Sequence, residues 1–408
     1  MQAVKQMLKK IENGTIVTPQ GFQAAGLHTK VKRKRNDLGA IVSEVPANAA
    51  AVYTLSKVVA APISVTKDSL AQAGKLQAVV VNSGNANACT GKKGLEDAYT
   101  MRNTFAEQLS VAPHFVAVAS TGVIGEEMPM EKITSGIKSL KPTATVEGAK
   151  AFNEAILTTD TCMKTACYET LIDGKKVTLA GTAKGSGMLA PNMGTMLAFI
   201  TTDANVDQQS LQLALNEVID ETFNLVTIDG DTSTNDTVVT MANGLANNEP
   251  LTPTHKEWNV FLQLLKQVCE DLAILIARDG EGATKLIEVE VKGALNKEEA
   301  NKIAKTVVGS NLVKTMVYGA DPNWGRIMMA IGKSGMTIDS ENVDIAIGSF
   351  PILKRSQPIA YSEEGLEKYL NESSIKIVID VHVGNSTGKA WGCDLTYDYV
   401  KINASYRT

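Results

Sequence analysis

The sequence predicts an α/β fold in two lobes, of which the second is the smaller. Short apolar runs rich in β-branched residues alternate along the chain with segments in which apolar residues recur at the helical period. The chain has 408 residues, which exceeds the length at which a single hydrophobic core stops growing. A further α/β succession begins near Leu286, where we expect the second lobe to start.

Five short apolar runs are the clearest expected strands. They span residues 77–82, 115–119, 195–201, 286–291 and 375–383. Glycine-containing turns follow the first two of these runs and precede the third. Because binding and catalytic groups are usually placed on loops at strand ends, these turns are the first candidates for a functional site.

Two helices are indicated by periodicity and by capping residues. Residues 257–278 carry apolar side chains at nearly every 3.6 positions, which predicts a helix with one buried face. These side chains are Trp258, Phe261, Leu264, Leu265, Val268, Leu272 and Ile276. Asn296 followed by Glu299 is typical of a helix N-cap and its third-position acid, and that helix is expected to stop near Gly309.

Composition and charge narrow the class of protein. Apolar residues make up 44% and charged residues 21% of the chain, as in ordinary compact globular proteins. The 40 basic and 44 acidic side chains give a net charge of −4, too small and too mixed to favour nucleic acid or an anionic membrane as partner. No apolar signal segment and no membrane-length apolar run is apparent, so we expect a cytoplasmic protein.

The cysteines and histidines do not suggest a metal site. The 5 cysteines are an odd number and widely spread, which fits reduced thiols in a reducing cytosol. The 4 histidines occur singly, and none lies near Cys162 and Cys167. We therefore expect no bound metal.

Two glycine motifs resemble nucleotide-binding loops only in part. Gly332-Lys333-Ser334 matches the end of a phosphate-binding loop, but Ile327 stands where that motif needs its first glycine. Residues 185–190 fit a dinucleotide fingerprint with a final alanine, yet the residues that follow predict a strand and not the required helix. A nucleotide-binding module is therefore the weaker alternative from a different functional class.

The Gly194-Thr195 pair is the most informative position, although a threonine after a Pro-Asn turn is most often only the first residue of a strand. Glycine has no Cβ, so it tolerates the strained backbone that an N-to-O acyl shift onto the threonine hydroxyl requires. Cleavage would leave Thr195 as a new N-terminus. Its α-amine, with a pKa of about 7.7–8, would serve as base for its own hydroxyl, which fits the lack of a recognisable Ser-His-Asp arrangement.

The segment MLAPNMGTMLAF from Met188 resembles the cleavage motif of the ornithine acetyltransferases, also called bifunctional glutamate N-acetyltransferases. In that family the threonine after the scissile bond is the nucleophile. Seven further segments resemble the family in order over nearly the whole chain: VNSGNANACTG from Val81, ASTGVIGE from Ala119, TTDT from Thr158, KGSGM from Lys184, ARDGEGATK from Ala277, YGADPNWGR from Tyr318 and INASYRT from Ile402. Gly194 stands where many relatives carry alanine, a difference that bears only on the rate of processing.

The resemblance implies a role for each of several residues. It makes Gly194-Thr195 the cleavage site and Thr121 and Gly122 the oxyanion hole, through the Thr121 hydroxyl and the Gly122 backbone N–H. The substrate-binding residues it implies are Thr158, Lys184, Thr195, Glu281, Asn403 and Thr408. A lysine beside the nucleophile suits an α-carboxylate, and a glutamate suits a substrate ammonium group. Without the family, these residues would be taken as ordinary turn residues or solvated charges.

The resemblance also implies a layered α/β sandwich of the self-cleaving N-terminal-threonine type and a ping-pong reaction. Thr195 takes the acetyl group of N-acetylornithine and passes it to glutamate in arginine biosynthesis, without a cofactor. Some members also accept acetyl-CoA as donor, and no residue here decides between the forms with one activity and with two. The expected pieces are 1–194 and 195–408, assembled as a heterotetramer of two cleaved pairs. The alternative is a self-processed N-terminal-nucleophile amidase or aminopeptidase, in which water accepts the acyl group.

Overall fold

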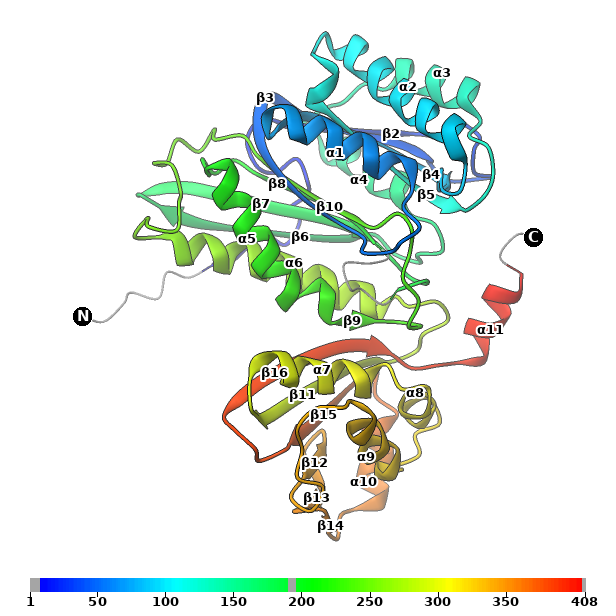
Figure 1. Ribbon diagram of the computed structural model, residues 1–408, viewed down its shortest axis with the longest axis vertical. Helices are drawn as coiled ribbons and strands as arrows, with labels where there is room; N and C mark the ends of the chain where they lie inside the picture. The colour runs from blue at the N-terminus through cyan, green and yellow to red at the C-terminus, as the bar shows by residue number, and fades with distance from the viewer. Residues whose placement is uncertain (1–7, 190–195, 406–408) are drawn as a thin grey trace. The chain divides into compact units, whose positions relative to one another are not determined.

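The structure, a computed structural model, describes residues 8–189 and 196–405. These residues form two compact units, drawn in Figure 1. The larger unit comprises the described residues up to Gly185, those from 196 to Asn224, and Thr232–Leu272. The smaller unit comprises the described residues from Ser186 to 189, Leu225–Asp231, and those from Ala273 to 405. Two short segments from the middle of the chain thus join its C-terminal part.

A mixed sheet forms the centre of the larger unit. In the described residues it has nine strands in the order β1-β6-β7-β8-β10-β3-β4-β5, with β2 paired to β3. β4 runs parallel to β5 and β8 runs parallel to β10, whereas β7–β8 and β10–β3 are antiparallel pairs. The strands are β1 (Lys9–Lys10), β2 (Phe22–Leu27), β3 (Leu38–Tyr53), β4 (Lys75–Asn85), β5 (Val116–Val123), β6 (Lys164–Ile172), β7 (Lys175–Lys184), β8 (Leu197–Thr202) and β10 (Thr237–Ala242).

Helices cover both faces of this sheet at β4 and β5, which explains why these parallel strands are apolar along their length. Ala78 and Val80 pack on one face with α1 (Ala61–Ala73), α2 (Gly91–Leu109) and α3 (Met130–Ser139). Val79 and Val81 pack on the other face with α4 (Val146–Ile156). Elsewhere, α5 (Gln208–Glu221) binds the backbone of β3 through Gln212, whose amide pairs with the N–H and carbonyl of Ala51. The predicted layered α/β class is confirmed.

The elements predicted in the larger unit are found with small shifts at their ends. Residues 77–82 lie in β4 and 116–119 in β5, whereas Phe115 closes a short 3-10 turn, Pro113–Phe115. The described part of the strand expected over 195–201 lies in β8. The periodic helix is α6 (Trp258–Arg278), and all seven of the apolar side chains that predicted it are buried.

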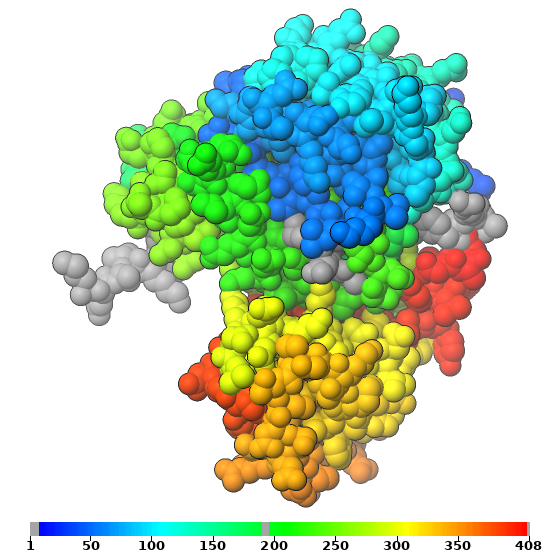
Figure 2. Space-filling view, in the orientation of Figure 1, coloured from blue at the N-terminus to red at the C-terminus, as the bar shows by residue number. Residues whose placement is uncertain are grey.

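The smaller unit is also α/β, as predicted. Its described residues form a seven-stranded sheet in the order β14-β13-β12-β15-β11-β16-β9. The strands are β9 (Val226–Thr227), β11 (Leu286–Ala294), β12 (Asp344–Ile347), β13 (Phe350–Lys354), β14 (Gln357–Pro358), β15 (Ser374–Asp380) and β16 (Ser386–Cys393). The helices are α7 (Lys297–Val308), α8 (Asn311–Tyr318), α9 (Trp324–Lys333), α10 (Glu363–Leu370) and α11 (Tyr397–Ala404). α11 forms part of the surface seen in red in Figure 2.

Two predictions for the smaller unit concern the ends of elements, namely the caps of α7 and the last residue of β15. The Asn296 side chain accepts a hydrogen bond from Glu299 N at 2.8 Å, and Gly309 is the C-cap, so the predicted capping of α7 is confirmed. The strand expected over 375–383 ends earlier, at Asp380. His382 has a left-handed backbone with φ +50°, and this turns the chain out of the sheet.

The discounted phosphate-loop motif lies at the wrong end of a helix. Gly332 and Lys333 close α9, and Ser334 is its C-cap. A phosphate-binding loop needs a helix N-terminus, where backbone N–H groups point at the anion. The prediction that these residues do not form a phosphate-binding loop is therefore confirmed. Over residues 8–189 and 196–405, no helix combines the length and apolarity that crossing a membrane requires.

Candidate functional site

Thr121 and Gly122 lie together at the carboxyl end of β5, opposite Ser83 and Gly84 of β4. Gly122 has φ +136°, a conformation that residues with a Cβ rarely adopt. A Cβ at Gly122 would also collide with the backbone of Gly84 and Asn85. Glycine is therefore required here, because the two parallel strands approach each other too closely for any side chain.

A buried polar network fixes the strand end that carries Thr121. Asn235 Nδ2 donates hydrogen bonds to Ser120 O at 2.8 Å and to Ala86 O at 2.6 Å. Ser120 Oγ donates to Asn82 Oδ1 at 2.6 Å, and Asn82 Nδ2 donates to Asn85 O at 2.9 Å. Each of these groups is buried and paired, and such networks hold a loop rigid. The Thr121 hydroxyl, by contrast, has no hydrogen-bond partner in the described part of the chain.

Thr158 lies in a turn just after α4, and Asp160 organises that turn. Asp160 Oδ2 accepts a hydrogen bond from Thr158 N at 3.0 Å, and Asp160 Oδ1 accepts one from Gly185 N at 2.8 Å. The turn is also tied to the Thr121 strand end. Ser83, the cross-strand neighbour of Thr121, donates its hydroxyl proton to Ala155 O at 2.5 Å near the end of α4.

Asp160 is the centre of a buried cluster of charges. Its Oδ1 is 2.7 Å from Lys164 Nζ, and both side chains are fully buried. Burial alone would raise the pKa of Asp160, but the positive charges of Lys184 and Lys164 outweigh it and hold that pKa below its ordinary value. The carboxylate is therefore ionised, and its single negative charge offsets one of the two positive charges of Lys164 and Lys184. This cluster explains how Lys184, only 6% exposed, is tolerated inside the fold.

Lys184 ends β7 directly beside the start of β8. Its cross-strand neighbour is Leu197, and the carbonyl of the preceding Met196 accepts a hydrogen bond from Thr237 N at 3.0 Å. β7 and β10 thus hold the first residues of β8 from both sides. Gly194 and Thr195 come immediately before Met196 in the sequence and lie outside the described residues.

In the smaller unit, the structure brings Glu281 and Asn403 together across 122 residues of sequence. Asn403 Nδ2 donates to Glu281 Oε2 at 2.7 Å and to Tyr399 O at 3.0 Å. Glu281 N donates to Ser186 O at 2.8 Å. A Cβ at Gly187 would collide with the Glu281 carboxylate, so the glycine makes room for this acid. Glu281 is only 7% exposed and is not the solvated turn acid that sequence alone would suggest.

α11 carries Asn403, and its first turn is fixed to the Glu281 turn. Thr396 Oγ1 accepts from Tyr399 N as the helix N-cap and donates to Gly282 O at 2.7 Å. The C-terminal helix is thereby ordered up to Ala404. Thr408, the last predicted substrate-binding residue, lies outside the described residues.

The predicted residues therefore fall into two groups, each described within its own unit. Thr121, Gly122, Thr158 and Lys184 belong to the larger unit, and Glu281 and Asn403 belong to the smaller. The residues that support them were not predicted from the sequence; chief among these are Asp160, Lys164, Asn82 and Asn235. The available signal was that Asn82 and Asp160 lie inside the family segments at Val81 and Thr158.

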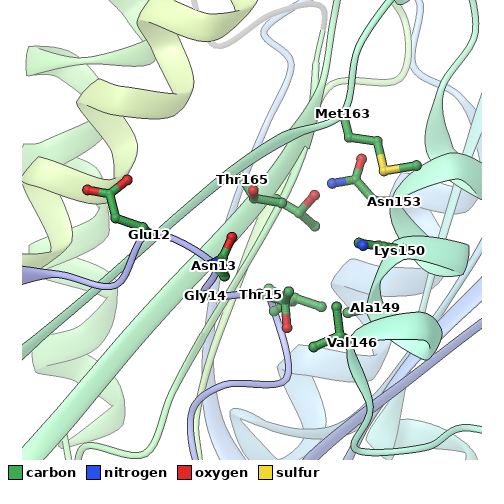
Figure 3. A pocket seen from close by; sticks show the side chains of 12 residues that line it. Glu12, Asn13, Gly14, Thr15, Val146, Ala149, Lys150, Asn153, Met163 and Thr165 are labelled. Atoms are coloured by element: carbon green, nitrogen blue, oxygen red, sulfur yellow. The ribbon is translucent and has the colours of Figure 1, made fainter.

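A cavity of about 350 Å³ lies in the larger unit among residues that were not predicted to form a site (Figure 3). Lys150 and Asn153 of α4, Thr165 of β6 and Glu12 are among its lining residues. Asn153 Oδ1 is buried and has no hydrogen-bond partner in residues 8–189 and 196–405. Asn153 Nδ2 donates to Lys164 O at 3.4 Å, so this cavity adjoins the backbone of the buried charge cluster.

The fold and these groups define an α/β enzyme. A hydroxyl and a glycine turn lie at the end of β5 and a buried lysine lies at the end of β7, groups that suit a reacting carbonyl and a carboxylate substrate. The chain belongs to the ArgJ family, whose family model matches residues 23–408. The family predicted from the sequence segments is thus confirmed.

Two relatives are similar in sequence to this chain over nearly its full length. The arginine biosynthesis bifunctional protein ArgJ of Halalkalibacterium halodurans is 63% identical over 400 residues, which cover 98% of this chain and 97% of the relative. The protein of the same name from Geobacillus kaustophilus is 60% identical over 410 residues, covering both chains fully. A solved chain of Mycobacterium tuberculosis ornithine acetyltransferase, complexed with ornithine, is 34% identical with a TM-score of 0.43, and the likeness covers 46% of this chain and 99% of that one.

Proposed function

We propose that Thr195, freed by self-cleavage after Gly194, carries the acetyl group in this enzyme. Membership of the ArgJ family makes the chain an acetyltransferase of arginine biosynthesis, and it favours acetyl transfer over the alternative of a self-processed amidase or aminopeptidase. The observation that carries the residue assignment is the buried Asp160–Lys164–Lys184 cluster, which flanks both Thr158 and the start of β8. The first residue of β8, Leu197, comes two residues after Thr195.

In the proposed reaction, the Thr195 hydroxyl attacks the acetyl carbonyl of N-acetylornithine, and the α-amine of Thr195 takes the hydroxyl proton. The Thr121 hydroxyl and the Gly122 N–H stabilise the oxyanion that forms. Ornithine leaves with the proton on its amine. Glutamate then takes the acetyl group from the threonine ester, which restores the Thr195 hydroxyl and yields N-acetylglutamate.

Charge supports the assignment of the substrate groups. Lys184 is almost fully buried, and a buried ammonium group binds a carboxylate more strongly than a solvated one does. We assign it to the α-carboxylate that both substrates carry, with Thr158 and Thr408 as further substrate contacts. Glu281 is assigned to the side-chain ammonium of ornithine. Asn403 acts as a positioning residue, because its amide orients the Glu281 carboxylate.

We further propose that acetyl-CoA serves as a second acetyl donor and that the enzyme has no bound cofactor. The supporting observation is that relatives 56–63% identical are named bifunctional. Both donors would acetylate the same threonine. The heterotetramer of two cleaved pairs is a proposal that follows from the family resemblance alone, and the cytoplasmic location is a proposal that follows from the sequence features described above.

Trapping of the acetyl group tests the proposed nucleophile. Purified protein is expected to run as two pieces, 1–194 and 195–408, and incubation with N-acetylornithine without acceptor should add one acetyl group to the second piece. Intact-mass measurement and peptide mapping locate it. Added glutamate should remove it as N-acetylglutamate, whereas a hydrolase would release acetate. An unmodified Thr195 peptide, or kinetics that require a ternary complex, would contradict the mechanism.

Thr121→Val is expected to lower kcat by roughly 10²- to 10³-fold and to change KM little, because a donor aimed at an oxyanion acts mainly in the transition state. Steady-state kinetics of the cleaved fraction measures this, since self-cleavage also passes through an oxyanion. Thr121→Ser keeps the hydroxyl and is the matched control, expected to stay within about 10-fold of wild type. Wild-type turnover by cleaved Thr121→Val would remove Thr121 from the oxyanion hole.

A further inference from the structure

The most basic segment of this slightly acidic protein lies outside the site described above. Residues 30–35, Lys-Val-Lys-Arg-Lys-Arg, carry five cations, whereas the whole chain has a net charge of −4. They belong to the connection between β2 and β3, here called the basic loop (residues 28–37). A high local density of like charge costs free energy through repulsion unless a partner offsets it.

The basic loop has a fixed conformation. Asp37 is fully buried, and its carboxylate accepts hydrogen bonds from Thr29 N at 2.7 Å and from Val31 N and Lys32 N at 2.9 Å each. Lys30 is held with φ +68°, a left-handed conformation that is unfavourable for a residue with a side chain. Strain of this kind persists where the surrounding structure imposes it, often at functional positions.

Two side chains attach the basic loop to the Thr158 turn. Lys32 Nζ donates to Leu157 O at 2.8 Å, and Arg35 donates to Asp160 O at 2.9 Å. These two carbonyls flank Thr158 on either side. Burial lowers the pKa of Lys32 to about 8, with the charge of Asp37 opposing the shift and that of Arg35 adding to it. These two hydrogen bonds anchor the basic loop to the turn that carries Thr158.

Other cations of this region face solvent. Lys30 and Lys34 are exposed, and neither ammonium group has a carboxylate partner in the described part of the chain. Lys132 of α3 reaches the same loop, where its Nζ donates to Lys30 O at 3.0 Å. Two carboxylates close to the loop are already engaged: Asp37 binds its backbone, and Asp160 belongs to the buried charge cluster.

We propose that the basic loop binds the phosphate groups of acetyl-CoA, with Lys30 and Lys34 as phosphate contacts. The inference rests on the proposed function, since it concerns how the second acetyl donor of that reaction is bound. Coenzyme A carries a 3′-phosphate and a diphosphate, whereas N-acetylornithine and glutamate carry no phosphate. Clustered Lys and Arg side chains are the groups that recognise phosphate, through charge-assisted hydrogen bonds.

The chemistry of this donor balances without a further reactant. The Thr195 hydroxyl oxygen forms a bond to the acetyl carbon, the thioester C–S bond breaks, and the hydroxyl proton ends on the departing coenzyme A sulfur. Glutamate then takes the acetyl group, and its amine proton restores the Thr195 hydroxyl. The phosphates bound at the basic loop take no part in bond making. Their binding lowers the free energy of the donor complex.

The double variant Lys30→Gln, Lys34→Gln tests the proposal through the two donors. We expect kcat/KM for acetyl-CoA to fall by about 10-fold or more, since the double variant removes two charge-assisted phosphate contacts. The kcat/KM for N-acetylornithine should stay within about 2-fold of wild type, because that donor does not reach these lysines. In a ping-pong scheme, kcat/KM of a donor is independent of the acceptor concentration. Lys333→Gln, Lys354→Gln removes the same charge from exposed positions of the smaller unit and is the matched control.

Binding of adenosine 3′,5′-bisphosphate separates this inference from the proposed function, because it needs no turnover. Calorimetry should show saturable binding to wild type that weakens by about 10-fold in the double variant and as salt rises from about 50 to about 200 mM. Inorganic phosphate should compete only weakly if the whole nucleotide end is recognised. The inference is overturned if wild type does not bind this bisphosphate, if kcat/KM falls equally for both donors, or if the control variant loses as much as the double variant. None of these outcomes contradicts acetyl transfer from N-acetylornithine. Failure of both donors in wild type contradicts the proposed function itself.

Discussion

Thr195→Ala is expected to give a protein that stays one uncut chain and loses at least about 10⁴-fold in acetyl transfer. The proposed mechanism uses the Thr195 hydroxyl twice. In that mechanism the hydroxyl attacks the Gly194 carbonyl in the acyl shift that cleaves the chain, and it later carries the acetyl group. Intact-mass measurement and an assay for N-acetylglutamate follow the two events in the same preparation.

Thr195→Ser is the matched control for this prediction, since serine keeps the hydroxyl and loses only a methyl group. It should be cleaved and should retain measurable transfer. Circular dichroism and thermal melting of Thr195→Ala must show a folded protein for the comparison to count. A folded, uncut Thr195→Ala protein that still transfers acetyl groups would exclude Thr195 as the nucleophile, and a cleaved one would exclude its role in processing.

Asp160→Asn is expected to lower the free energy of unfolding by about 3–5 kcal/mol, the usual cost of breaking a buried ion pair by removing one partner. Lys164 is fully buried and Lys184 nearly so, and both lose the negative charge beside them. Asparagine has only one side-chain oxygen, so it can accept only one of the two hydrogen bonds that Thr158 N and Gly185 N donate to the separate oxygens of Asp160. Urea or thermal denaturation of the purified variant measures the loss.

The acid side of the pH profile gives this prediction a second test. The pKa of Asp160 is depressed in the folded protein, so its stabilising contribution is present above the unfolded pKa of about 3.9 and is lost as the pH falls below it. The stability difference between wild type and Asp160→Asn should thus be constant from about pH 6 to 8 and shrink below about pH 4.

Glu169→Gln is the matched control for Asp160→Asn. Its partners, Lys9 at 2.9 Å and Lys176 at 3.8 Å, are both largely exposed, so breaking these pairs should cost less than about 1 kcal/mol each. Equal losses in Glu169→Gln and Asp160→Asn would mean that burial does not strengthen the Asp160 pair. The charge cluster would then not hold Lys184 in place.

Local sequence patterns were sufficient to predict single helices. The period of the apolar residues identified α6, and Asn296 with Glu299 located the start of α7, because capping and amphipathicity act over one or two turns of chain. The end of β15 was misplaced by three residues. That boundary depends on the left-handed turn at His382, and nothing in a run of apolar and polar letters shows a backbone dihedral.

The sequence by itself determined the α/β class, the family, and the identity of the candidate nucleophile and substrate contacts, because these depend on residue types in a fixed order. Only the tertiary structure decided how those residues are supported. It paired Asn403 with Glu281 and buried Asp160 between two lysines. It also attached the basic loop to the Thr158 turn over 125 residues of chain. The physical reason is that burial and long-range pairing set the strength of a charge or a hydrogen bond, and both arise only when distant segments pack together.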